Sequence, residues 1–403
     1  MKAFLYGTVS AAAVALAATT AFADGVSNDV VKIGVLGDMS GVYSTGFSGE
    51  GAVAAVKMAV EDFGGTVLGK KIEVISADHQ NKADVASATA RQWIDQDHVD
   101  MITDLTNSAV GLAVQQLASE KKVITMNTGS ASADLTGKAC TKYGIHYGYD
   151  TNALSAGTAS AVVKNGGDSW YFITADYAFG HALQKSTTAV VEKMGGKVLG
   201  SSDVPLASTD FSSYLLQAQS SGAKVVGLAN AGQDTVNSIK QAHEFGLTAA
   251  GQQLAGMLVL ISDVKALGTD VAKGLSFTVG WYWNMDDASR AWKEKYMKYS
   301  KGAAPTFVHA ADYSLTMAYL KAVKAAGTDD PDAVRAELGK AKIDDFFARG
   351  GQIRPDGLLE HDMYLVQVQD AKSDPWDVVK VVQTIPGKEA YASLKDGGCP
   401  LVK

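Results

Sequence analysis

The segment that decides the fold is VKIGVL at residues 31–36, followed by GAVAAVKMAVEDF at residues 51–63. The first segment is a short apolar run, and the second repeats its apolar residues at helical spacing. A buried strand followed by such a helix is the repeating unit of a parallel sheet with helices on both faces. The chain repeats this unit, with predicted strands at 72–76, 99–103 and 123–125 and predicted helices at 85–94 and 109–120.

The same alternation starts again after Asp150. The chain has 403 residues, which is enough for two domains because a domain commonly has about 100–200 residues. We therefore predict a second α/β domain of similar layout. Its predicted strands lie at 170–174, 197–204 and 225–229, and its predicted helices lie at 153–164, 181–194, 211–220 and 235–245.

Extended, aromatic segments lie where one series of elements stops and the next starts, at 145–150 and 278–283. We expect both to cross between the domains, with a third crossing near 363–368. The helices predicted at 288–299 and 309–326 then return the chain to the first lobe. Lobes built from discontinuous segments can hinge over a cleft. The predicted fold is α/β, with two Rossmann-like lobes that have parallel central sheets and are joined by three hinge crossings.

The amino terminus has the features of a secretory signal peptide. Lys2 precedes an alanine-rich apolar run at 11–18, and Ala21-Phe22-Ala23 forms a small-residue cleavage site. The alternative is a membrane anchor, but this run is too short to cross about 30 Å of hydrocarbon as a stable helix. We predict that residues 1–23 direct export and that cleavage occurs near Ala23.

The crossings divide the rest of the chain into two lobes and a tail. The two cysteines, Cys140 and Cys399, fall in the first lobe and in the tail. In an oxidising compartment an even number of cysteines favours a disulfide, which here would tie the tail to the first lobe. Two unpaired buried thiols are the alternative. The expected boundaries are 24–147 with 284–350 for the N-terminal lobe, 148–283 with 351–385 for the C-terminal lobe, and 386–403 for the C-terminal tail.

Composition and motifs argue against several classes of function. The net charge is −7, with both signs mixed along the chain, so we expect no nucleic-acid partner. Gly46-Phe47-Ser48-Gly49-Glu50 lacks the glycine that a nucleophile elbow needs at its fifth position. Asp78-His79 and His361-Asp362 have no further ligands at metal-binding spacing. We therefore expect a protein that is not an enzyme and that needs no metal or cofactor.

An open parallel sheet binds its ligand beyond the carboxyl ends of its strands. The loop 127–134 follows a predicted strand and is rich in small and hydroxyl residues, including Gly129, Ser130 and Ala131. Its amides and hydroxyls suit a carboxylate, and Asn107 and Ser108 offer the same groups nearby. Helix capping is the alternative role for such residues. The complete set of predicted cleft loops is 37–48, 104–108, 127–134, 175–180, 230–234 and 256–258.

Aromatic residues accompany these polar loops. Tyr43, Tyr177 and Phe179 lie on predicted cleft loops, and Trp281-Tyr282-Trp283 lies at a predicted crossing. Aromatic side chains can enclose a flat or apolar ligand while a few polar groups fix its orientation. For at least one of the two tryptophans we favour the simpler role of packing the crossing segment.

Four sequence blocks together resemble the type I periplasmic binding proteins of the branched-chain amino acid (leucine-binding protein-like) family of ABC importers. The resemblance implies a periplasmic, monomeric protein that captures a small molecule and delivers it to a membrane permease and its ATPase. The blocks are 31–35 with 38–41, 68–74, 128–136 and 176–181.

The resemblance also implies roles for individual residues. Ser130, with Asn107 or Ser108, matches positions that take the ligand carboxylate. Amino acid binders of this family also place an acid near Met257, where this chain has none. An unpaired ammonium there would cost several kcal/mol, which disfavours a free amino acid unless Asp234 substitutes. The expected ligand-binding set is Tyr43, Asn107, Ser108, Gly129, Ser130, Ala131, Tyr177, Phe179, Asn230, Asp234, Met257 and Tyr282.

Three further blocks look closer to the branch of this family that binds aromatic carboxylates. They are 77–82, 210–213 and 398–403. We therefore expect a ligand such as a benzoate or a hydroxycinnamate derivative. The alternatives are a branched-chain amino acid or amide, and, in other functional classes, an exported enzyme or a sensory ligand-binding protein.

Overall fold

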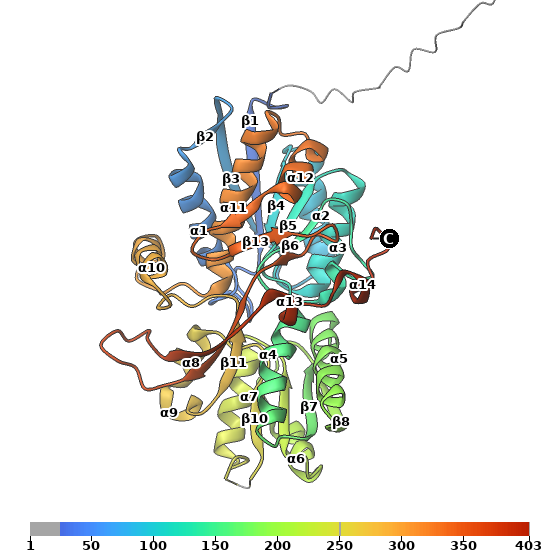
Figure 1. The fold of residues 1–403 in the computed structure, drawn as a ribbon, viewed down its shortest axis with the longest axis vertical. Coiled ribbons are helices and arrows are strands. Elements are labelled where there is room, and N and C mark those ends of the chain that lie inside the picture. The colour runs from blue at the N-terminus through green and yellow to red at the C-terminus, as the bar shows by residue number, and fades with distance from the viewer. Residues whose placement is uncertain (1–24, 250, 403) are drawn as a thin grey trace, which may run out of the picture.

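The computed structural model describes residues 25–249 and 251–402, which form two α/β lobes (Figure 1). The parallel sheets and the flanking helices confirm the predicted fold class. The predicted signal peptide lies outside the described residues. None of the described helices combines the length and the apolar character that a membrane span requires.

The first lobe is built on a six-stranded sheet with the order β2-β3-β1-β4-β5-β6. All strands are parallel except β2, which pairs antiparallel with β3. The central strand β1 buries Ile33 and Val35 completely, as expected for a strand covered by helices on both faces. The elements are β1 (Val30–Gly37), α1 (Gly49–Phe63), β2 (Thr66–Val67), β3 (Lys70–Asp78), α2 (Ala83–Asp95), β4 (Met101–Asp104), α3 (Ser108–Glu120), β5 (Ile124–Asn127), the 3-10 helix η1 (Ala133–Leu135) and β6 (Gly144–His146).

The second lobe is built on a four-stranded parallel sheet with the order β10-β9-β7-β8. Every residue of β7 and β9 is buried, so these strands form the centre of the lobe. Its elements are α4 (Thr151–Lys164), β7 (Ser169–Ala175), α5 (Ala178–Lys193), β8 (Lys197–Val204), α6 (Ser212–Ser220), β9 (Val225–Ala229), α7 (Gln233–Glu244), β10 (Gln253–Gly256), α8 (Ile261–Leu267) and α9 (Thr269–Ala272).

Two small antiparallel sheets were not predicted from the sequence. One has the order β11-β15-β16 and packs on α4, and the other has the order β12-β13-β14. The boundary expected at residue 351 falls inside β13 (Arg349–Ile353). The bounds of the others are β11 (Ser276–Val279), β12 (Lys342–Asp344), β14 (Leu359–Glu360), β15 (Met363–Val368) and β16 (Val379–Ile385).

Three longer helices remain, and the first two follow the sequence prediction closely. They are α10 (Asp287–Tyr299), α11 (Phe307–Ala326) and α12 (Pro331–Lys340), and α11 packs against α1 of the first lobe. Thr306 caps the start of α11 through Val308 N, and Gly327 ends it at φ 70°, a conformation that glycine adopts without steric cost. The short helices α13 (Gly387–Ala390) and α14 (Leu394–Gly397) complete the chain.

Three passages of chain between the lobes meet at the carbonyl of Gly148. This oxygen lies 2.8 Å from His361 Nε2 and accepts a 3.4 Å hydrogen bond from Tyr391 Oη. Gly280 packs so closely that an added Cβ would lie 2.9 Å from the same oxygen. The carbonyl oxygen of Gly148 is therefore the place where all three crossings and the start of the tail come into contact.

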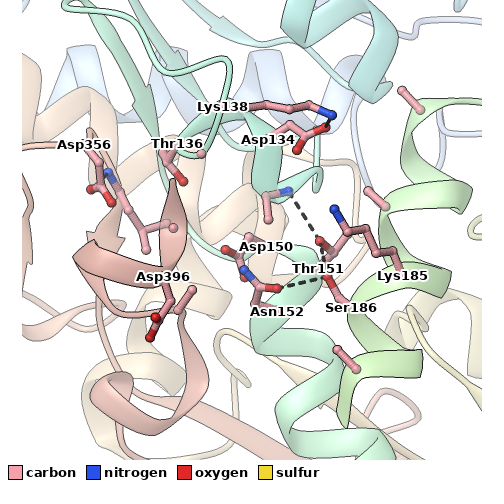
Figure 2. Close-up of a pocket in the computed structure, with 18 of the residues that line it drawn as sticks. Asp134, Thr136, Lys138, Asp150, Thr151, Asn152, Lys185, Ser186, Asp356 and Asp396 are labelled. Atoms are coloured by element: carbon pink, nitrogen blue, oxygen red, sulfur yellow. Dashed lines mark hydrogen bonds and ion pairs between the residues drawn. The ribbon is translucent and has the colours of Figure 1, made fainter. Parts of the chain in front are cut away.

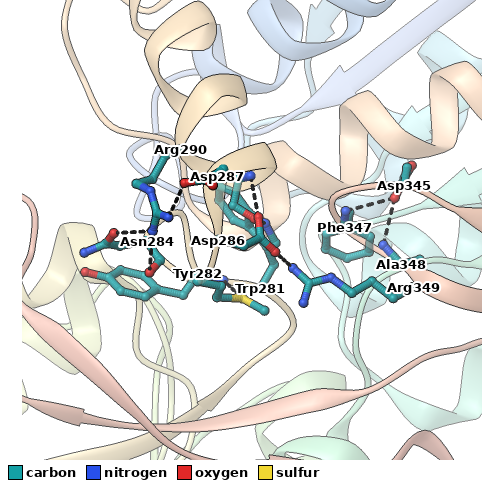
Figure 3. Close-up of polar contacts among 12 residues, drawn as sticks. Trp281, Tyr282, Asn284, Asp286, Asp287, Arg290, Asp345, Phe347, Ala348 and Arg349 are labelled. Atoms are coloured by element: carbon teal, nitrogen blue, oxygen red, sulfur yellow. Dashed lines mark hydrogen bonds and ion pairs between the residues drawn. The ribbon is translucent and has the colours of Figure 1, made fainter.

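The second crossing is braced by polar and aromatic contacts (Figure 3). Trp281 Nε1 donates to Ser289 Oγ at 3.0 Å, and its ring packs edge-on against Trp292 with 5.4 Å between centroids. Asp286 pairs with Arg349, so α10 and β13 are also joined. Trp281 therefore packs the crossing segment, as we favoured for at least one of the two tryptophans.

The predicted disulfide between Cys140 and Cys399 is present, with 5.6 Å between their Cα atoms. It fixes the tail, including α14, beside the first lobe (Figure 1).

We predict that reduction of this bridge lowers the melting temperature. The bridge closes a loop with a sequence separation of 259 residues, and the chain-entropy model assigns about 5 kcal/mol to a loop of this size. Thermal unfolding with and without dithiothreitol measures the effect. The Cys399→Ser variant is the control, because it should melt at the lower temperature in both conditions. A wild-type melting temperature that does not respond to reduction would contradict the prediction.

Candidate functional site

The candidate site lies where the carboxyl ends of the two parallel sheets face each other, as the topological rule predicts. The loop after β1 reaches across to the second lobe. Gln233 N donates to the Val42 carbonyl at 3.2 Å. A Cβ added to Gly232 would lie 2.5 Å from that same carbonyl, so the close approach requires glycine.

Two tyrosines join the lobes directly. The hydroxyls of Tyr43, after β1, and Tyr177, after β7, are 2.6 Å apart. Burial holds the pKa of both phenols well above its usual value, so both hydroxyls stay protonated and act as donors and acceptors. The structure therefore shows the cleft in a closed arrangement.

Further aromatic side chains extend from this pair toward the crossings. Tyr149, in the first crossing, donates from its hydroxyl to the Gly129 carbonyl at 3.1 Å. Its ring meets Phe307 edge-on with 5.0 Å between centroids. The cleft is thus bordered by aromatic groups from both lobes and from a crossing. The other two ring pairs are Tyr43 with Phe47 at 5.7 Å and Tyr177 with Phe179 at 5.9 Å.

The loop after β4 has an unusual backbone. Asp104, Leu105 and Asn107 have φ values of 70°, 54° and 81°, although non-glycine residues avoid this region. Such strain is concentrated at functional sites. Asn107 also caps α3, since its side-chain oxygen accepts from Ala109 N at 3.0 Å and from Val110 N at 3.4 Å. The loop is therefore held in a fixed shape at the positive end of the α3 dipole.

The hydroxyl groups that were predicted to bind a carboxylate join the two first-lobe loops in this structure. Ser130 Oγ lies 2.5 Å from the Leu105 carbonyl and 3.0 Å from the Asn107 carbonyl, so its proton is already donated. Ser108 Oγ accepts from Ser132 N at 3.1 Å. These side chains shape the loops, and Asn107 caps α3, which is one of the roles that we weighed for it.

Beneath these loops lie two buried acids that the sequence analysis did not single out. Asp104 accepts from Thr106 Oγ1 at 2.5 Å and from Ser48 Oγ. Asp312 accepts from Thr128 Oγ1 at 2.6 Å, and its other oxygen is buried without a partner. Burial raises the pKa of Asp104 to about 7 and the pKa of Asp312 well above its usual value, and the charge of Asp104 raises the pKa of Asp312 further. At neutral pH the pair therefore carries less than two negative charges.

On the second lobe, Asn230 and Met257 support the cleft from within. Asn230 accepts from Thr235 Oγ1 at 2.7 Å and donates to Ser238 Oγ at 3.3 Å, which fixes the turn into α7. Met257 is fully buried. The polar groups of Asn230 are thus already paired in the closed arrangement.

Tyr282, which was expected in the ligand-binding set, uses its hydroxyl within the second crossing. Its hydroxyl donates to Asp377 Oδ1 at 2.8 Å, and Asn284 Nδ2 reaches the other oxygen of Asp377 at 3.2 Å. The polar end of Tyr282 therefore braces the second crossing rather than joining the Tyr43–Tyr177 pair.

Asp234, in the first turn of α7, has one satisfied and one unsatisfied oxygen. Oδ2 accepts from Ala207 N at 3.1 Å, while Oδ1 is buried with no partner. Only 2% of the residue is exposed, and burial raises the pKa of its carboxyl to about 6. Its charge acts on the hydroxyls of both Tyr43 and Tyr177. Asp234 is therefore an acceptor at the second-lobe side of the cleft.

A polar pocket of about 540 Å³ lies beside this cleft (Figure 2). It is bordered by the loop 133–138, the first turn of α4, one face of α5 and the tail. The charged and polar groups pair with one another, as in Lys138 with Asp134 at 3.0 Å and Ser186 with Asn152 at 3.0 Å. This pocket lacks the aromatic border of the cleft. Among the described residues, no group of three or more His, Cys, Asp or Glu side chains is placed to hold a metal ion.

Comparison with known proteins places this architecture in a family. The family model described as periplasmic binding protein matches residues 30–373. A periplasmic binding protein from Burkholderia mallei is similar in structure, with 53% identity, a TM-score of 0.91 and coverage of 94% of this chain and 100% of that chain. A branched-chain amino acid ABC transporter periplasmic ligand-binding protein from Burkholderia xenovorans LB400 has 39% identity, a TM-score of 0.82 and coverage of 93% and 100%.

More distant proteins share the fold. A solute-binding protein of an ABC transporter from R. palustris, in complex with 4-hydroxybenzoate, has 23% identity, a TM-score of 0.79 and coverage of 89% of this chain and 97% of that chain. A Leu/Ile/Val-binding protein homolog from Brucella melitensis is 27% identical over 258 residues. That match covers 63% of this chain and 64% of the relative's length.

The buried acids under the first-lobe loops predict a pH dependence of stability. The folded-state pKa of Asp104 is raised to about 7 and that of Asp312 is raised well above its usual value, whereas an unfolded aspartate titrates near about 4. The folded protein therefore holds more protons on these two acids in this interval, and their contribution to the free energy of unfolding falls as pH rises from about 4 to about 7. Asp312→Asn removes one of these acids and should make the fall shallower.

Melting temperatures between pH 4.5 and 8 measure this effect. Asp203→Asn is the control, because Asp203 is exposed on β8 and should leave the slope unchanged. The account would be wrong if Asp312→Asn lost stability more steeply with rising pH than the wild-type protein does.

Proposed function

Because this chain belongs to the family of periplasmic binding proteins, we propose that it is the solute-binding component of an ABC importer and that its ligand is a small aromatic carboxylate. The ligand lies between the lobes, at the carboxyl ends of the parallel strands. The protein then delivers it to a membrane permease and its ATPase. We further propose that it is a monomer that works in the periplasm after cleavage near Ala23.

The observation that carries this proposal is the aromatic border of the cleft. Tyr43, Tyr177 and Tyr149 come from the first lobe, the second lobe and the first crossing. Tyr43 and Tyr149 are buried, Tyr177 is partly buried, and the hydroxyls of Tyr43 and Tyr177 are 2.6 Å apart. Rings from opposite sides can enclose a flat ligand. The loops 104–108 and 127–132 lie at the start of α3, where the helix dipole and the backbone amides favour an anion.

The relatives support the coarse function and divide on the ligand. The B. xenovorans protein is named for branched-chain amino acids, while the R. palustris protein holds 4-hydroxybenzoate on the same fold. The stretch 254–258 offers no acid for an ammonium group, which favours the aromatic carboxylate. Asp234 favours the second candidate, a branched-chain amino acid, because its unpaired oxygen could accept from an ammonium.

An exported enzyme is the less favoured class. The buried acids Asp104 and Asp312 lie beneath the cleft loops and bond to hydroxyls of their own lobe. The hydroxyl of Ser130 donates to backbone carbonyls, and no base is bonded to it. Activation of a nucleophile requires a base within hydrogen-bond reach. Binding without turnover is therefore the function that these contacts favour.

Lobe closure is the mechanism of capture. A ligand shifts a hinge equilibrium only by the difference between its affinities for the two states. Contacts that exist only in the closed state supply that difference, and the Tyr43–Tyr177 pair is one of them. The crossings at Gly148 let the lobes rotate as units while their sheets stay intact.

We predict that aromatic carboxylates stabilise the protein against heat. A ligand present at about 100 times its dissociation constant adds about 2.7 kcal/mol to the free energy of unfolding. Thermal-shift measurements with benzoate, 4-hydroxybenzoate and 4-hydroxycinnamate, beside leucine, isoleucine and valine, test this. A large shift with the aromatic acids alone is expected. A shift with leucine alone would replace the proposed ligand with the amino acid.

We also predict that Tyr177→Phe weakens ligand affinity by roughly two- to tenfold, because it removes one hydrogen bond, worth about 0.5–1.5 kcal/mol, that forms only on closure. Calorimetric titration measures the affinity, and small-angle scattering measures compaction on binding. Tyr171→Phe is a matched control, since its hydroxyl bonds to Ser202 Oγ within one lobe at 2.8 Å. Equal effects of the two substitutions on affinity would show that the pair across the cleft has no special role.

A further inference from the structure

One buried ammonium group contacts the first lobe, a crossing and the second lobe at once. Lys293 lies on α10, and only 3% of its side chain is exposed. Its Nζ donates to Asp374 Oδ2 at 2.5 Å and to Glu294 Oε1 at 3.1 Å, and it lies 4.3 Å from the centroid of the Trp283 ring. A buried lysine needs such partners, because an unpaired charge in the interior is costly.

Lys293 is fixed to the first lobe, because α10 packs on α1. Tyr296 Oη donates to the Gly51 carbonyl at 3.1 Å, and Lys295 pairs with Asp62 near the end of α1. The ammonium therefore moves with the first lobe.

Asp374 is fixed to the second lobe. It lies in the loop 369–378, which joins β15 to β16 of the small sheet that packs on α4. The loop lies beside α8 (Figure 1), where Lys265 Nζ donates to the Pro375 carbonyl at 2.9 Å. The ion pair between Lys293 and Asp374 therefore bridges the two lobes.

The same ion pair lies against the second crossing. The ring of Trp283 forms a cation–π contact with the ammonium of Lys293, and Trp283 Nε1 donates to the Trp376 carbonyl of the loop at 3.2 Å. A rotation of the lobes about the crossings changes the distance between Lys293 Nζ and Asp374 Oδ2. Because a hydrogen bond weakens steeply once its atoms separate, this contact depends on the angle between the lobes.

A purely structural role predicts a different behaviour. Two groups that are fixed to the same lobe stabilise the open and closed states equally, so their contact does not change the hinge equilibrium. Glu294 is such a group, because it follows Lys293 on α10, and 69% of its side chain is exposed. Asp374 offers the same ammonium a carboxylate from the opposite lobe.

We propose that the ion pair between Lys293 and Asp374 is a latch that favours the closed state, so that it raises ligand affinity from outside the ligand site. Both are positioning residues, since they act through the hinge equilibrium. The inference rests on the proposed function, which is capture by lobe closure, and it names a contact that sets the strength of that capture.

The test compares two variants that each remove one acid from the same ammonium. Asp374→Asn keeps an acceptor for Trp376 N, which Asp374 Oδ1 bonds at 2.8 Å, and loses the charge that crosses between the lobes. Calorimetric titration of the full mature protein with 4-hydroxybenzoate and with leucine should show roughly three- to thirtyfold weaker binding to Asp374→Asn, as expected for loss of a charged hydrogen bond.

Glu294→Gln is the matched control and should bind as the wild type does. Asp374→Glu keeps the charge and should retain most of the affinity. Damage to the fold in Asp374→Asn would lower the stoichiometry of binding in the titration and leave the dissociation constant of the folded fraction unchanged.

Small-angle scattering covers the case in which the unliganded protein is already closed. Affinity then responds little to the latch, because the competent state is already populated. Instead, unliganded Asp374→Asn should have a larger radius of gyration than unliganded wild type and Glu294→Gln. If Asp374→Asn matches Glu294→Gln in both affinity and radius of gyration, the latch is overturned.

The two measurements also separate failure of the latch from failure of the proposed function. If the wild type binds neither 4-hydroxybenzoate nor leucine, the proposed ligands are wrong. The unliganded scattering then decides the latch, since expansion of Asp374→Asn supports it and an unchanged radius of gyration contradicts it. If the wild type binds a ligand and Asp374→Asn behaves as Glu294→Gln does, the latch is wrong while the proposed function stands.

Discussion

The carbonyl of Gly148 holds together the passages of chain on which the two-lobed architecture depends. His361 Nε2 lies 2.8 Å from this oxygen, and Gly280 packs against it without room for a side chain. Each crossing therefore leaves its lobe at a fixed position. Because the strands of each central sheet are parallel, this arrangement turns their carboxyl ends toward each other, and a binding cleft follows from the topology.

Within the cleft, polar side chains fall into two groups with different roles. Ser130, Asn107 and Asn230 satisfy backbone or side-chain groups of their own lobe, so they give the loops a fixed shape. The hydroxyls of Tyr43 and Tyr177 face each other across the cleft, and one carboxylate oxygen of Asp234 has no hydrogen-bond partner. Preorganised loops lower the entropy cost of binding, and the second group supplies contacts that depend on closure and on the ligand.

Much of the fold was predictable because buried parallel strands and amphipathic helices leave clear periodic signals. The predicted strands at 197–204 and 225–229 coincide with β8 and β9. The sheets that contain β12–β16 were missed. These short antiparallel strands, late in the chain, do not alternate with helices, so they lack the signal that marks a parallel sheet. The side chains were harder to predict. Sequence position placed Ser130 on a cleft loop, but only the structure shows that its proton goes to the Leu105 carbonyl.

Hydrogen exchange with and without ligand tests the central claim, which is that a ligand is held between the facing carboxyl ends of both sheets. The account predicts slower exchange on binding in loops of both lobes, at 104–108 and 127–132 and at 176–179 and 230–234. Closure buries these four segments together. Protection restricted to one lobe, or centred on the polar pocket around 133–138 and α5, would contradict it.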